Sequence, residues 1–325
     1  MELTYADVVA AREVVYRHLP PTPMWSYPVL DAAAGATVFV KHENVQPIGA
    51  FKVRGGLTLL AGMSAAERER GTVTYSTGNH AQSLAYASAL YGARCTVVMP
   101  AAANPAKAAA VRSWGAEVVL TGDNLEGAQR HAEELAERTG GRLVSPGDTP
   151  PLLAGVGTLY LEILEAQPDL DAIVVPVGSG TGAGAATIVA AELSPKTQVI
   201  GVQSLSSRAA FDAWQSGELA KRPNGTRIDG LATGRAYEFP QRLLRAGLAD
   251  FVLLSDDQIG AAQRLLATAA HTLAEGAGAA ALAAVLHRPD LFAGKRVAVV
   301  CTGGNADAAE LAGLAQDQPA ATIRP

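Results

Sequence analysis

Lys52 has both the residue type and the surroundings for covalent chemistry. It stands between the apolar residues Phe51 and Val53, at the expected start of a helix. Pro47 and Gly49, just before it, are residues that end regular secondary structure. An amine held among apolar neighbours loses hydration, and this loss favours its neutral, nucleophilic form. Such a lysine can form a Schiff base, although most lysines are solvated surface residues. The neighbouring residues alone do not decide between these two roles.

A glycine-rich turn after an apolar run predicts an anion-binding site. Residues 172–177 have the composition of a buried strand. The turn that follows them, at the start of an expected helix, comprises Gly178, Ser179, Gly180, Thr181 and Gly182. Closely spaced glycines let backbone N–H groups converge on an anion, and the N-terminus of the helix adds a positive dipole end. We therefore expect a phosphate group here.

Two nucleotide-binding motifs fit this turn poorly. A P-loop would need Gly-Lys-Ser/Thr, which the turn lacks. A dinucleotide fingerprint is loosely met by residues 180–185, but Gln203 stands where that motif needs an acidic residue about twenty positions on. A simple phosphomonoester site is the remaining ligand-binding interpretation, and tight packing of the turn is the alternative without a ligand.

A second expected strand end carries side chains that suit a carboxylate. Its residues are Ser76, Thr77, Gly78, Asn79 and His80. Two hydroxyls, an amide and free backbone donors at a helix N-terminus can together bind such an anion. Capping of the helix by Ser76 or Thr77 would account for the same residues without a ligand. His80 could act as a base, but a single histidine in the first turn of a helix is more often structural.

The last strand-to-helix connection has the same character. Residues 296–301 have the pattern of a strand. The turn that follows them comprises Thr302, Gly303, Gly304 and Asn305. Ligands of open α/β sheets collect at the carboxyl ends of the strands. Lys52 and the three turns all fall at such ends or just past them, so we expect them to form one site.

Strands and helices alternate along most of the chain. The expected strands are residues 37–41, 72–76, 95–99, 117–120, 172–177, 198–202, 251–254 and 296–301. The expected helices are residues 3–19, 79–91, 105–114, 124–138, 152–167, 182–193, 256–270, 276–286 and 306–315, and a short polar helix is expected to start at the capping box of residues 64–67. This alternation is typical of an α/β fold with open, mostly parallel sheets that are covered by helices.

The alternation falls into two series. We expect a small α/β domain at residues 63–148, inserted into a large domain that is formed by residues 1–62 and 149–325. Residues 217–240 are polar, contain glycine and show little periodicity. Loops of this length inside a compact domain are usually functional.

Composition excludes several classes of protein. The 325 residues are 49% hydrophobic and 18% charged with a net charge of −5, and Lys and Arg do not cluster, so we expect no nucleic-acid partner. We expect no membrane-spanning segment and no signal peptide. Cys95 and Cys301 lie far apart in apolar runs and are interpreted as reduced core residues. We expect a cytoplasmic protein.

Together the four motifs resemble those of fold-type II pyridoxal-phosphate enzymes, in the group of serine/threonine dehydratases (ammonia-lyases) and serine racemases. The residues that carry the resemblance are 46–55, 76–80, 178–182 and 302–305, in the family's order and spacing. The resemblance implies a tryptophan synthase β-like fold with two open sheets. It also implies pyridoxal 5'-phosphate as cofactor, a small amino acid as substrate, and a homodimer.

The resemblance also implies roles for single residues. The residues that would contact the cofactor are Phe51, Lys52, Asn79, Gly178, Ser179, Gly180, Thr181, Gly182, Glu275 and Thr302. Among these, Lys52 would carry the Schiff base, Asn79 would lie against the 3-hydroxyl, and Thr302 would meet the pyridine nitrogen. The residues that would bind the substrate carboxylate are Ser76, Thr77, Gly78, Asn79 and His80.

Four positions depart from the family pattern. Ala50 replaces a frequent serine, and Thr302 stands where serine is commoner. Thr77 occupies the place of a serine that serves racemases as acid/base, so Thr77 is a second candidate catalytic residue. Gln203 occupies the place of a glutamate that ligates a divalent cation, so we expect no metal.

These features favour β-elimination from L-threonine or L-serine, which yields a 2-oxo acid and ammonia. A serine or 3-hydroxyaspartate racemase or dehydratase is one alternative, and a β-replacement enzyme of a biosynthetic pathway is another. A non-catalytic cofactor-binding protein is disfavoured, because Lys52 and all four motifs are intact.

Overall fold

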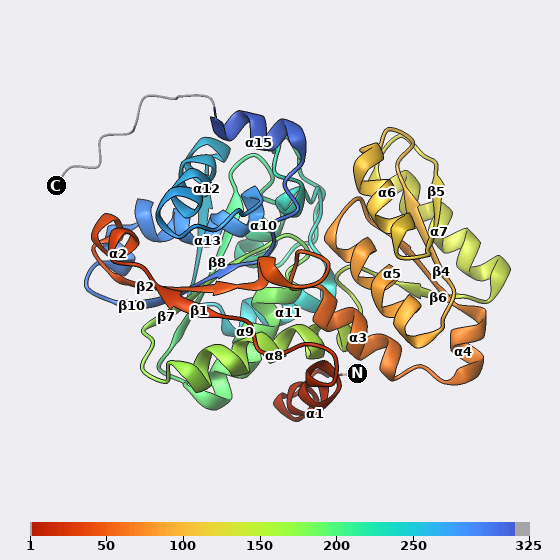
Figure 1. The fold of residues 1–325 in the computed structure, drawn as a ribbon, viewed down its shortest axis with the longest axis horizontal. Coiled ribbons are helices and arrows are strands. Elements are labelled where there is room, and N and C mark those ends of the chain that lie inside the picture. The colour runs from red at the N-terminus through yellow and green to blue at the C-terminus, as the bar shows by residue number, and fades with distance from the viewer. Residues whose placement is uncertain (1, 316–325) are drawn as a thin grey trace.

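The apolar runs of the sequence form two separate sheets in the computed structural model, which describes residues 2–315 (Figure 1). The larger sheet has six strands in the order β1-β2-β10-β7-β8-β9. Their bounds are Met24–Ser26 for β1, Thr37–His42 for β2, Arg296–Cys301 for β10, Ala172–Pro176 for β7, Gln198–Ser204 for β8 and Asp250–Leu254 for β9. Only β1 runs antiparallel to its neighbour. The expected α/β class with mostly parallel sheets is confirmed.

The smaller sheet has four parallel strands in the order β5-β4-β3-β6. Their bounds are Glu117–Leu120 for β5, Cys95–Met99 for β4, Thr72–Tyr75 for β3 and Arg142–Val144 for β6. Strand β6 was not expected, because three residues are too few to show a period. Both sheets fall within the expected ranges of the small and large domains, whose boundaries stay a prediction. Residues 316–325 of the expected large domain lie outside the described part.

Helices cover both faces of each sheet. Those of the larger part are α1 (Tyr5–Tyr16), α2 (Pro28–Ala34), α3 (Val53–Ala61), α8 (Pro150–Ala166), α9 (Thr181–Leu193), α10 (Ala209–Ser216), α11 (Glu238–Gly247), α12 (Asp256–Ala269), α13 (Gly276–His287), α14 (Pro289–Phe292) and α15 (Ala308–Ala315). Those of the smaller part are α4 (Ala65–Arg70), α5 (Asn79–Tyr91), α6 (Pro105–Ser113) and α7 (Leu125–Thr139). Short 3₁₀ turns lie at Glu43–Val45 (η1) and Asp229–Leu231 (η2). No helix within residues 2–315 has the length and apolar character to cross a membrane.

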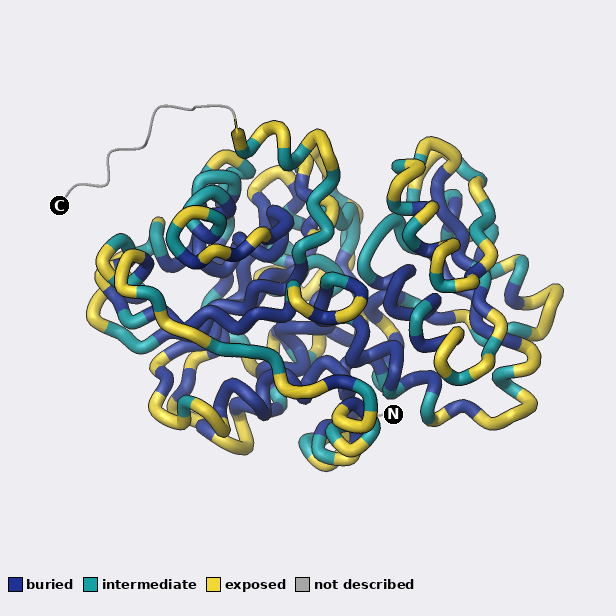
Figure 2. The backbone as a smooth tube through the Cα atoms, viewed as in Figure 1, coloured by how far each residue is buried: buried dark blue, intermediate teal, exposed yellow. Residues whose placement is uncertain are grey.

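Central strands are buried on both faces, which explains their continuous apolar runs. In β7, Val174 packs into the core on one face of the larger sheet, and Ile173 and Val175 pack into the core on the other. Figure 2 shows this buried interior along the strands. Helices α10 and α11 were not expected, and α11 shortens the irregular segment 217–240, because it begins at Glu238. Pro240 sits in the first turn of α11, where a missing N–H is tolerated.

Two segments that are distant in the sequence are joined directly beside the sheet. The Phe51 N–H donates to the Thr302 carbonyl at 3.0 Å, and the Gly304 N–H donates to the Gly49 carbonyl at 2.9 Å. Ala50 and Gly303 form an antiparallel bridge between these bonds. Because β2 and β10 are parallel neighbours, the turns that follow them emerge at the same edge. Lys52 and Thr302 are thereby brought together.

A buried ionic cluster anchors the start of α3. The Arg54 side chain, 0% exposed, pairs with Glu43 at 2.7 Å and with Glu162 at 2.6 Å. Lys41 pairs with Glu162 at 2.5 Å, so that two cations face two carboxylates. Burial opposes ionisation of Glu43, but the Arg54 charge and the hydrogen bonds from Arg54 and Thr22 together outweigh burial and lower the pKa of this carboxyl. Removal of one partner would leave a buried charge unpaired, so the cluster fixes the backbone just after Lys52.

Candidate active site

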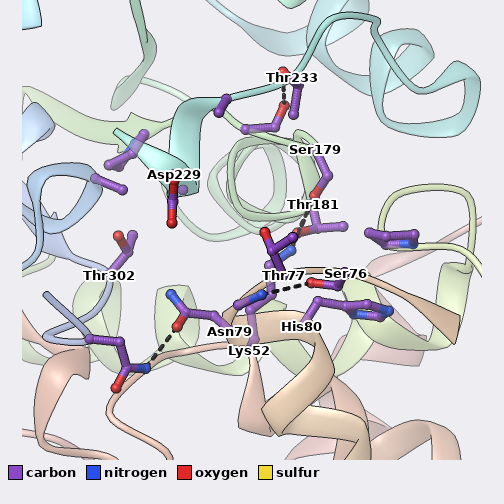
Figure 3. A pocket seen from close by; sticks show the side chains of 18 of the residues that line it. Lys52, Ser76, Thr77, Asn79, His80, Ser179, Thr181, Asp229, Thr233 and Thr302 are labelled. Carbon is purple, nitrogen blue, oxygen red and sulfur yellow. Dashed lines mark hydrogen bonds between the residues drawn. The ribbon is translucent and has the colours of Figure 1, made fainter. Parts of the chain in front are cut away.

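A cavity of about 150 Å³ lies where the strand-end turns of the two sheets face each other (Figure 3). Every residue expected to act in catalysis, cofactor binding or substrate binding lines it. These residues are Phe51, Lys52, Ser76, Thr77, Gly78, Asn79, His80, Gly178, Ser179, Gly180, Thr181, Gly182, Glu275 and Thr302. The expectation that the four motifs form one site therefore agrees with the geometry.

Lys52 lies in the N-cap position of α3 and reaches into the cavity. Its Nζ donates to Thr181 Oγ1 at 2.5 Å and to Ser179 Oγ at 3.1 Å. Burial lowers the pKa of this amine to about 7, because desolvation disfavours the charged form. At neutral pH a large fraction of Lys52 is therefore an unprotonated nucleophile.

The turn between β7 and α9 presents backbone donors to the cavity. Gly180 occupies the N-cap position with φ +87°, in the left-handed region that favours glycine, and no side chain caps the helix. A Cβ on Gly178 would lie 2.3 Å from the Gly230 carbonyl oxygen, so only glycine fits there. The first N–H groups of α9 and the hydroxyls of Ser179 and Thr181 can hold a phosphate.

The turn between β3 and α5 repeats this arrangement in the smaller sheet. Gly78 is the N-cap residue of α5, and no side chain caps the helix. The Ser76 hydroxyl accepts a hydrogen bond from the Gly78 N–H at 3.2 Å, one residue before the helix begins. Capping by Ser76 or Thr77, which was the alternative without a ligand, is therefore wrong. The N-terminus of α5 can bind an anion.

His80 has a structural partner within the smaller part. Its Nε2 lies 2.9 Å from Thr74 Oγ1, and the Thr74 hydroxyl donates to the Val144 carbonyl at 2.7 Å. The single hydroxyl proton is thus used, so Thr74 accepts from Nε2–H of His80. Burial and the nearby Lys52 lower the pKa of His80 to about 3. The ring is neutral at physiological pH and contributes no positive charge to the cavity.

Asn79 is held by Glu275 and by Asn305, the last residue of the 302–305 motif. Its Nδ2 donates to Glu275 Oε1 at 2.6 Å, and its Oδ1 accepts from Asn305 Nδ2 at 2.7 Å. Burial raises the pKa of Glu275 to about 7, although the hydrogen bond from Asn79 opposes this shift. A Cβ on Gly303 would meet Glu275 Oε1 at 2.4 Å, so glycine is required beside this carboxyl. The amide of Asn79 therefore enters the cavity with a fixed orientation.

Several lining residues were not expected from the sequence. They include Tyr75, Lys107, Leu125, Pro146, Asp229, Thr233 and Tyr237. Asp229, Thr233 and Tyr237 belong to the segment 217–240, whose length and polarity indicated a functional loop. No sequence pattern indicates that the other four residues, Tyr75, Lys107, Leu125 and Pro146, line a cavity. Their position there depends on how the two sheets face each other.

Gln203 lies outside this cavity in a buried hydrogen-bond network. Its Oε1 accepts from the Phe211 N–H at 3.1 Å, and its Nε2 donates to Thr233 Oγ1 at 3.4 Å. Across residues 2–315, no three His, Cys, Asp or Glu side chains gather in a group that could hold a metal ion. Independence from divalent cations stays a prediction.

The fold and the site define a class of enzyme, and comparison with known proteins gives the same class. The family model of pyridoxal-phosphate dependent enzymes matches residues 15–303, and the chain belongs to this family. Pyridoxal phosphate is its cofactor. The residues present fit this group, because a buried lysine with a lowered pKa lies beside an uncapped helix N-terminus with two hydroxyls.

Individual relatives catalyse different reactions on amino acids. An L-threonine ammonia-lyase from Thermotoga maritima is 35% identical over 307 residues, which cover 94% of this chain and 76% of the relative. A beta-hydroxyaspartate dehydratase from Paracoccus denitrificans is 34% identical over 305 residues, which cover 94% of this chain and 96% of the relative. The structure of maize serine racemase has a TM-score of 0.91 and 25% sequence identity, and covers 96% of this chain and 97% of that chain.

Proposed function

We propose that this enzyme eliminates water from L-threonine or L-serine and releases a 2-oxo acid and ammonia. One observation carries the proposal: a buried lysine with a pKa of about 7 stands between two uncapped helix N-termini, those of α5 and α9. One N-terminus suits the permanent phosphate of the cofactor and the other a transient carboxylate. The similarity to an L-threonine ammonia-lyase over 94% of the chain supports this reaction.

The cofactor would be held by residues of the larger part and by Asn79 of the smaller part. The first N–H groups of α9, with Ser179 and Thr181, would bind its phosphate, and Phe51, Asn79, Glu275 and Thr302 would surround its ring. When bound, pyridoxal phosphate supplies a π-system that withdraws negative charge from the substrate Cα. Thr302 offers the ring nitrogen a neutral hydroxyl, which stabilises positive charge there less than a carboxylate would. This choice favours rapid loss of a β-substituent.

Lys52 would move the proton at the substrate Cα. Its neutral form accepts that proton as a general base, and a pKa near the working pH favours both uptake and release. The hydroxyls of Ser179 and Thr181 lie within hydrogen-bond distance of Nζ and can stabilise the ammonium that results. Ser76, Thr77 and the N-terminus of α5 would meanwhile hold the substrate carboxylate and so fix the orientation of Cα.

Racemisation is the second candidate function, and it is supported by the similarity to maize serine racemase. Racemisation needs an acid/base on the face of the substrate opposite Lys52. Thr77 lines the cavity and carries a hydroxyl, but its branched Cβ restricts the rotamers that could deliver a proton. We therefore propose that elimination is faster than inversion.

The test follows both products from the same reaction. L-Serine and L-threonine are incubated with the enzyme in D₂O, and 2-oxo acid and inverted amino acid are measured over time. If elimination dominates, 2-oxo acid forms faster than inverted amino acid, and Thr77→Ala keeps the same ratio of the two rates. Faster formation of the inverted amino acid, abolished by Thr77→Ala, would replace the lyase by a racemase. β-Replacement becomes the leading function if neither product forms.

We also propose that the enzyme acts as a cytoplasmic homodimer. Exposed apolar side chains such as Trp25, Val29 and Val45, which are 56%, 59% and 58% exposed, support a partner surface on this part of the chain. Light scattering of the purified protein at micromolar concentration tests the dimer, and a monomer mass would contradict it.

A further inference from the structure

Four apolar or aromatic residues line the part of the cavity next to the carboxylate turn: Tyr75, Leu125, Pro146 and Tyr237. We call them the apolar wall. We propose that the apolar wall determines specificity: it accepts a small aliphatic β-substituent and excludes substrates with a second carboxylate, with Leu125 as the deciding residue. The inference rests on the proposed β-elimination, for which it names the substrate class.

Packing and burial hold the residues of the apolar wall in place. Leu125, the first residue of α7, packs against the apolar cluster of the smaller sheet that contains Tyr75. Tyr237 packs on the backbone beside Pro146, since a Cβ on Gly147 would lie 2.3 Å from Tyr237 Cγ. Tyr75 is 2% exposed and Tyr237 5% exposed. Burial raises the pKa of both hydroxyls, so neither ring carries a charge at neutral pH.

The position of the wall matches the substrate and not the cofactor. Tyr75 directly precedes Ser76, where the carboxylate turn begins. Among the residues that fit the cofactor, Ser179 and Thr181 lie at the start of α9 and Thr302 lies after β10, all in the larger part, and only Asn79 comes from α5. In Figure 3, Thr302 and His80 lie on opposite sides of Lys52. A substrate with its amine near Lys52 and its carboxylate at α5 therefore has its β-substituent near Leu125.

No unpaired cation among the described lining residues could bind a second carboxylate. The basic residues that line the cavity are Lys52, His80 and Lys107. Lys52 is committed to the cofactor, and His80 is neutral with a pKa of about 3. Lys107 forms an ion pair with Asp229. A carboxylate placed against Leu125 would lose its hydration without gaining a partner.

A different cation, Arg235, lies beside the wall, where its charge and hydrogen bonding oppose the rise in the pKa of Tyr75 that burial causes. The Arg235 guanidinium stacks on the Tyr237 ring, 5.5 Å from its centroid, and Arg235 does not line the cavity. Rotation of this side chain past Tyr237 is the event that would let the site accept a dicarboxylic substrate. The experiment must therefore separate Leu125 from Arg235.

The experiment compares L-threonine, L-serine and L-threo-3-hydroxyaspartate with the cofactor-loaded enzyme. Wild type should prefer threonine to hydroxyaspartate by at least about 100-fold in kcat/KM, and threonine to serine by about fivefold or more. Leu125→Arg should raise the hydroxyaspartate-to-threonine ratio by at least about tenfold. Leu125→Ala should weaken binding of threonine more than that of serine. Leu135→Ala is the matched control, because Leu135 packs in the same cluster from the same helix without lining the cavity.

Substrate affinity is read separately from turnover, through the change in absorbance of the bound cofactor when each amino acid is added. If no substrate is turned over but threonine still binds more tightly than hydroxyaspartate, the proposed function fails and the specificity inference stands. Comparable affinities and rates for threonine and hydroxyaspartate in wild type would overturn the inference, and Arg235→Gln would then remove the hydroxyaspartate activity. If Leu125→Arg loses the absorbance of the bound cofactor, Leu125→Gln serves as the second variant. A hydroxyaspartate-to-threonine ratio of kcat/KM that is unchanged in Leu125→Gln would overturn the role of Leu125.

Discussion

The N-termini of α9 and α5 use the same device for two different purposes. Each follows a parallel strand, each begins with glycine in the N-cap position, and neither is capped by a side chain. The turn before α9 follows β7, in the interior of the six-stranded sheet, and Gly178 is closed in by the Gly230 carbonyl. The turn before α5 is open: a Cβ on Gly78 would meet no atom within 4 Å.

This difference matches the lifetimes of the two proposed ligands. A cofactor phosphate stays bound through many turnovers, and a closely packed turn that is already in the required conformation favours tight binding. A substrate carboxylate must enter and leave in every turnover, which an open turn permits. Packing around a helix N-terminus, more than its dipole, separates a permanent anion site from a transient one. The following experiments test this difference, from the largest expected effect to the smallest.

Loss of the lysine between the two sites should have the largest effect. Lys52→Ala removes both the covalent link and the general base, so kcat should fall at least about 10³-fold. The visible absorption of the lysine-bound cofactor should disappear as well. Lys196→Ala, at a side chain that is 68% exposed, is the control and should leave both unchanged. Borohydride reduction that labels a peptide without Lys52 would contradict the assignment.

Paired glycine substitutions test the packing difference directly. Gly178→Ala forces a Cβ to within 2.3 Å of the Gly230 oxygen, so cofactor affinity should fall about tenfold or more. Gly78→Ala meets no atom within 4 Å and should leave cofactor affinity unchanged. Titration of the cofactor-free variants with pyridoxal phosphate measures both. Equal losses in the two variants would show that the turns do not differ as described.

The pH dependence of cofactor attachment tests the state of Lys52. Only the neutral amine attacks, and its pKa is lowered from 10.5 to about 7, so the amine is protonated at lower pH and neutral at higher pH. The attachment rate should therefore rise about tenfold from pH 6 to pH 8 and level off above pH 7. A rise of about 100-fold without levelling over the same interval would indicate an ordinary lysine. Stopped-flow absorbance on the cofactor-free protein measures the rate.

Loss of a hydroxyl at the open turn before α5 should weaken binding of the substrate and leave binding of the cofactor unchanged. Ser76→Ala removes one hydrogen-bonding group, so KM for L-threonine should rise about two- to twelvefold while cofactor affinity stays the same. Ser179→Ala, at the closed turn, should show the opposite pattern, with weaker cofactor binding and little change in KM for the saturated enzyme. The two-turn assignment is contradicted if both variants shift the same parameter.

Removal of divalent cations should have no effect. Gln203, at the end of β8, offers amide groups that are already bonded to Phe211 and Thr233, and hard cations prefer charged oxygens. A chelator should leave the rate of oxo acid formation unchanged. Loss of activity that Mg²⁺ restores would reveal ligands at another place.

Much of this site could be predicted from the sequence, because glycines and hydroxyls that cluster at strand ends are typical of anion-binding turns. The fold class and the meeting of the four motifs followed from strand–helix alternation. The cap of α5 could not be assigned, since Ser76, Thr77 and Gly78 are all residues that occur at helix N-termini. Leu125 and Tyr237 could not be found either, because only the approach of the two sheets makes an ordinary leucine or tyrosine part of a cavity.

The position of β10 has a consequence for how the protein is made. This strand lies between β2 and β7 but follows β1, β2, β7, β8 and β9 in the sequence, at residues Arg296–Cys301. During synthesis, β1 and β2 emerge first but cannot join β7, β8 and β9 until β10 leaves the ribosome and fills the gap. The hydrogen bonds of residues 49–51 likewise cannot form until residues 302–304 have been synthesised. The larger sheet therefore cannot be completed, and the cofactor site cannot form, before residues 296–304 have been translated.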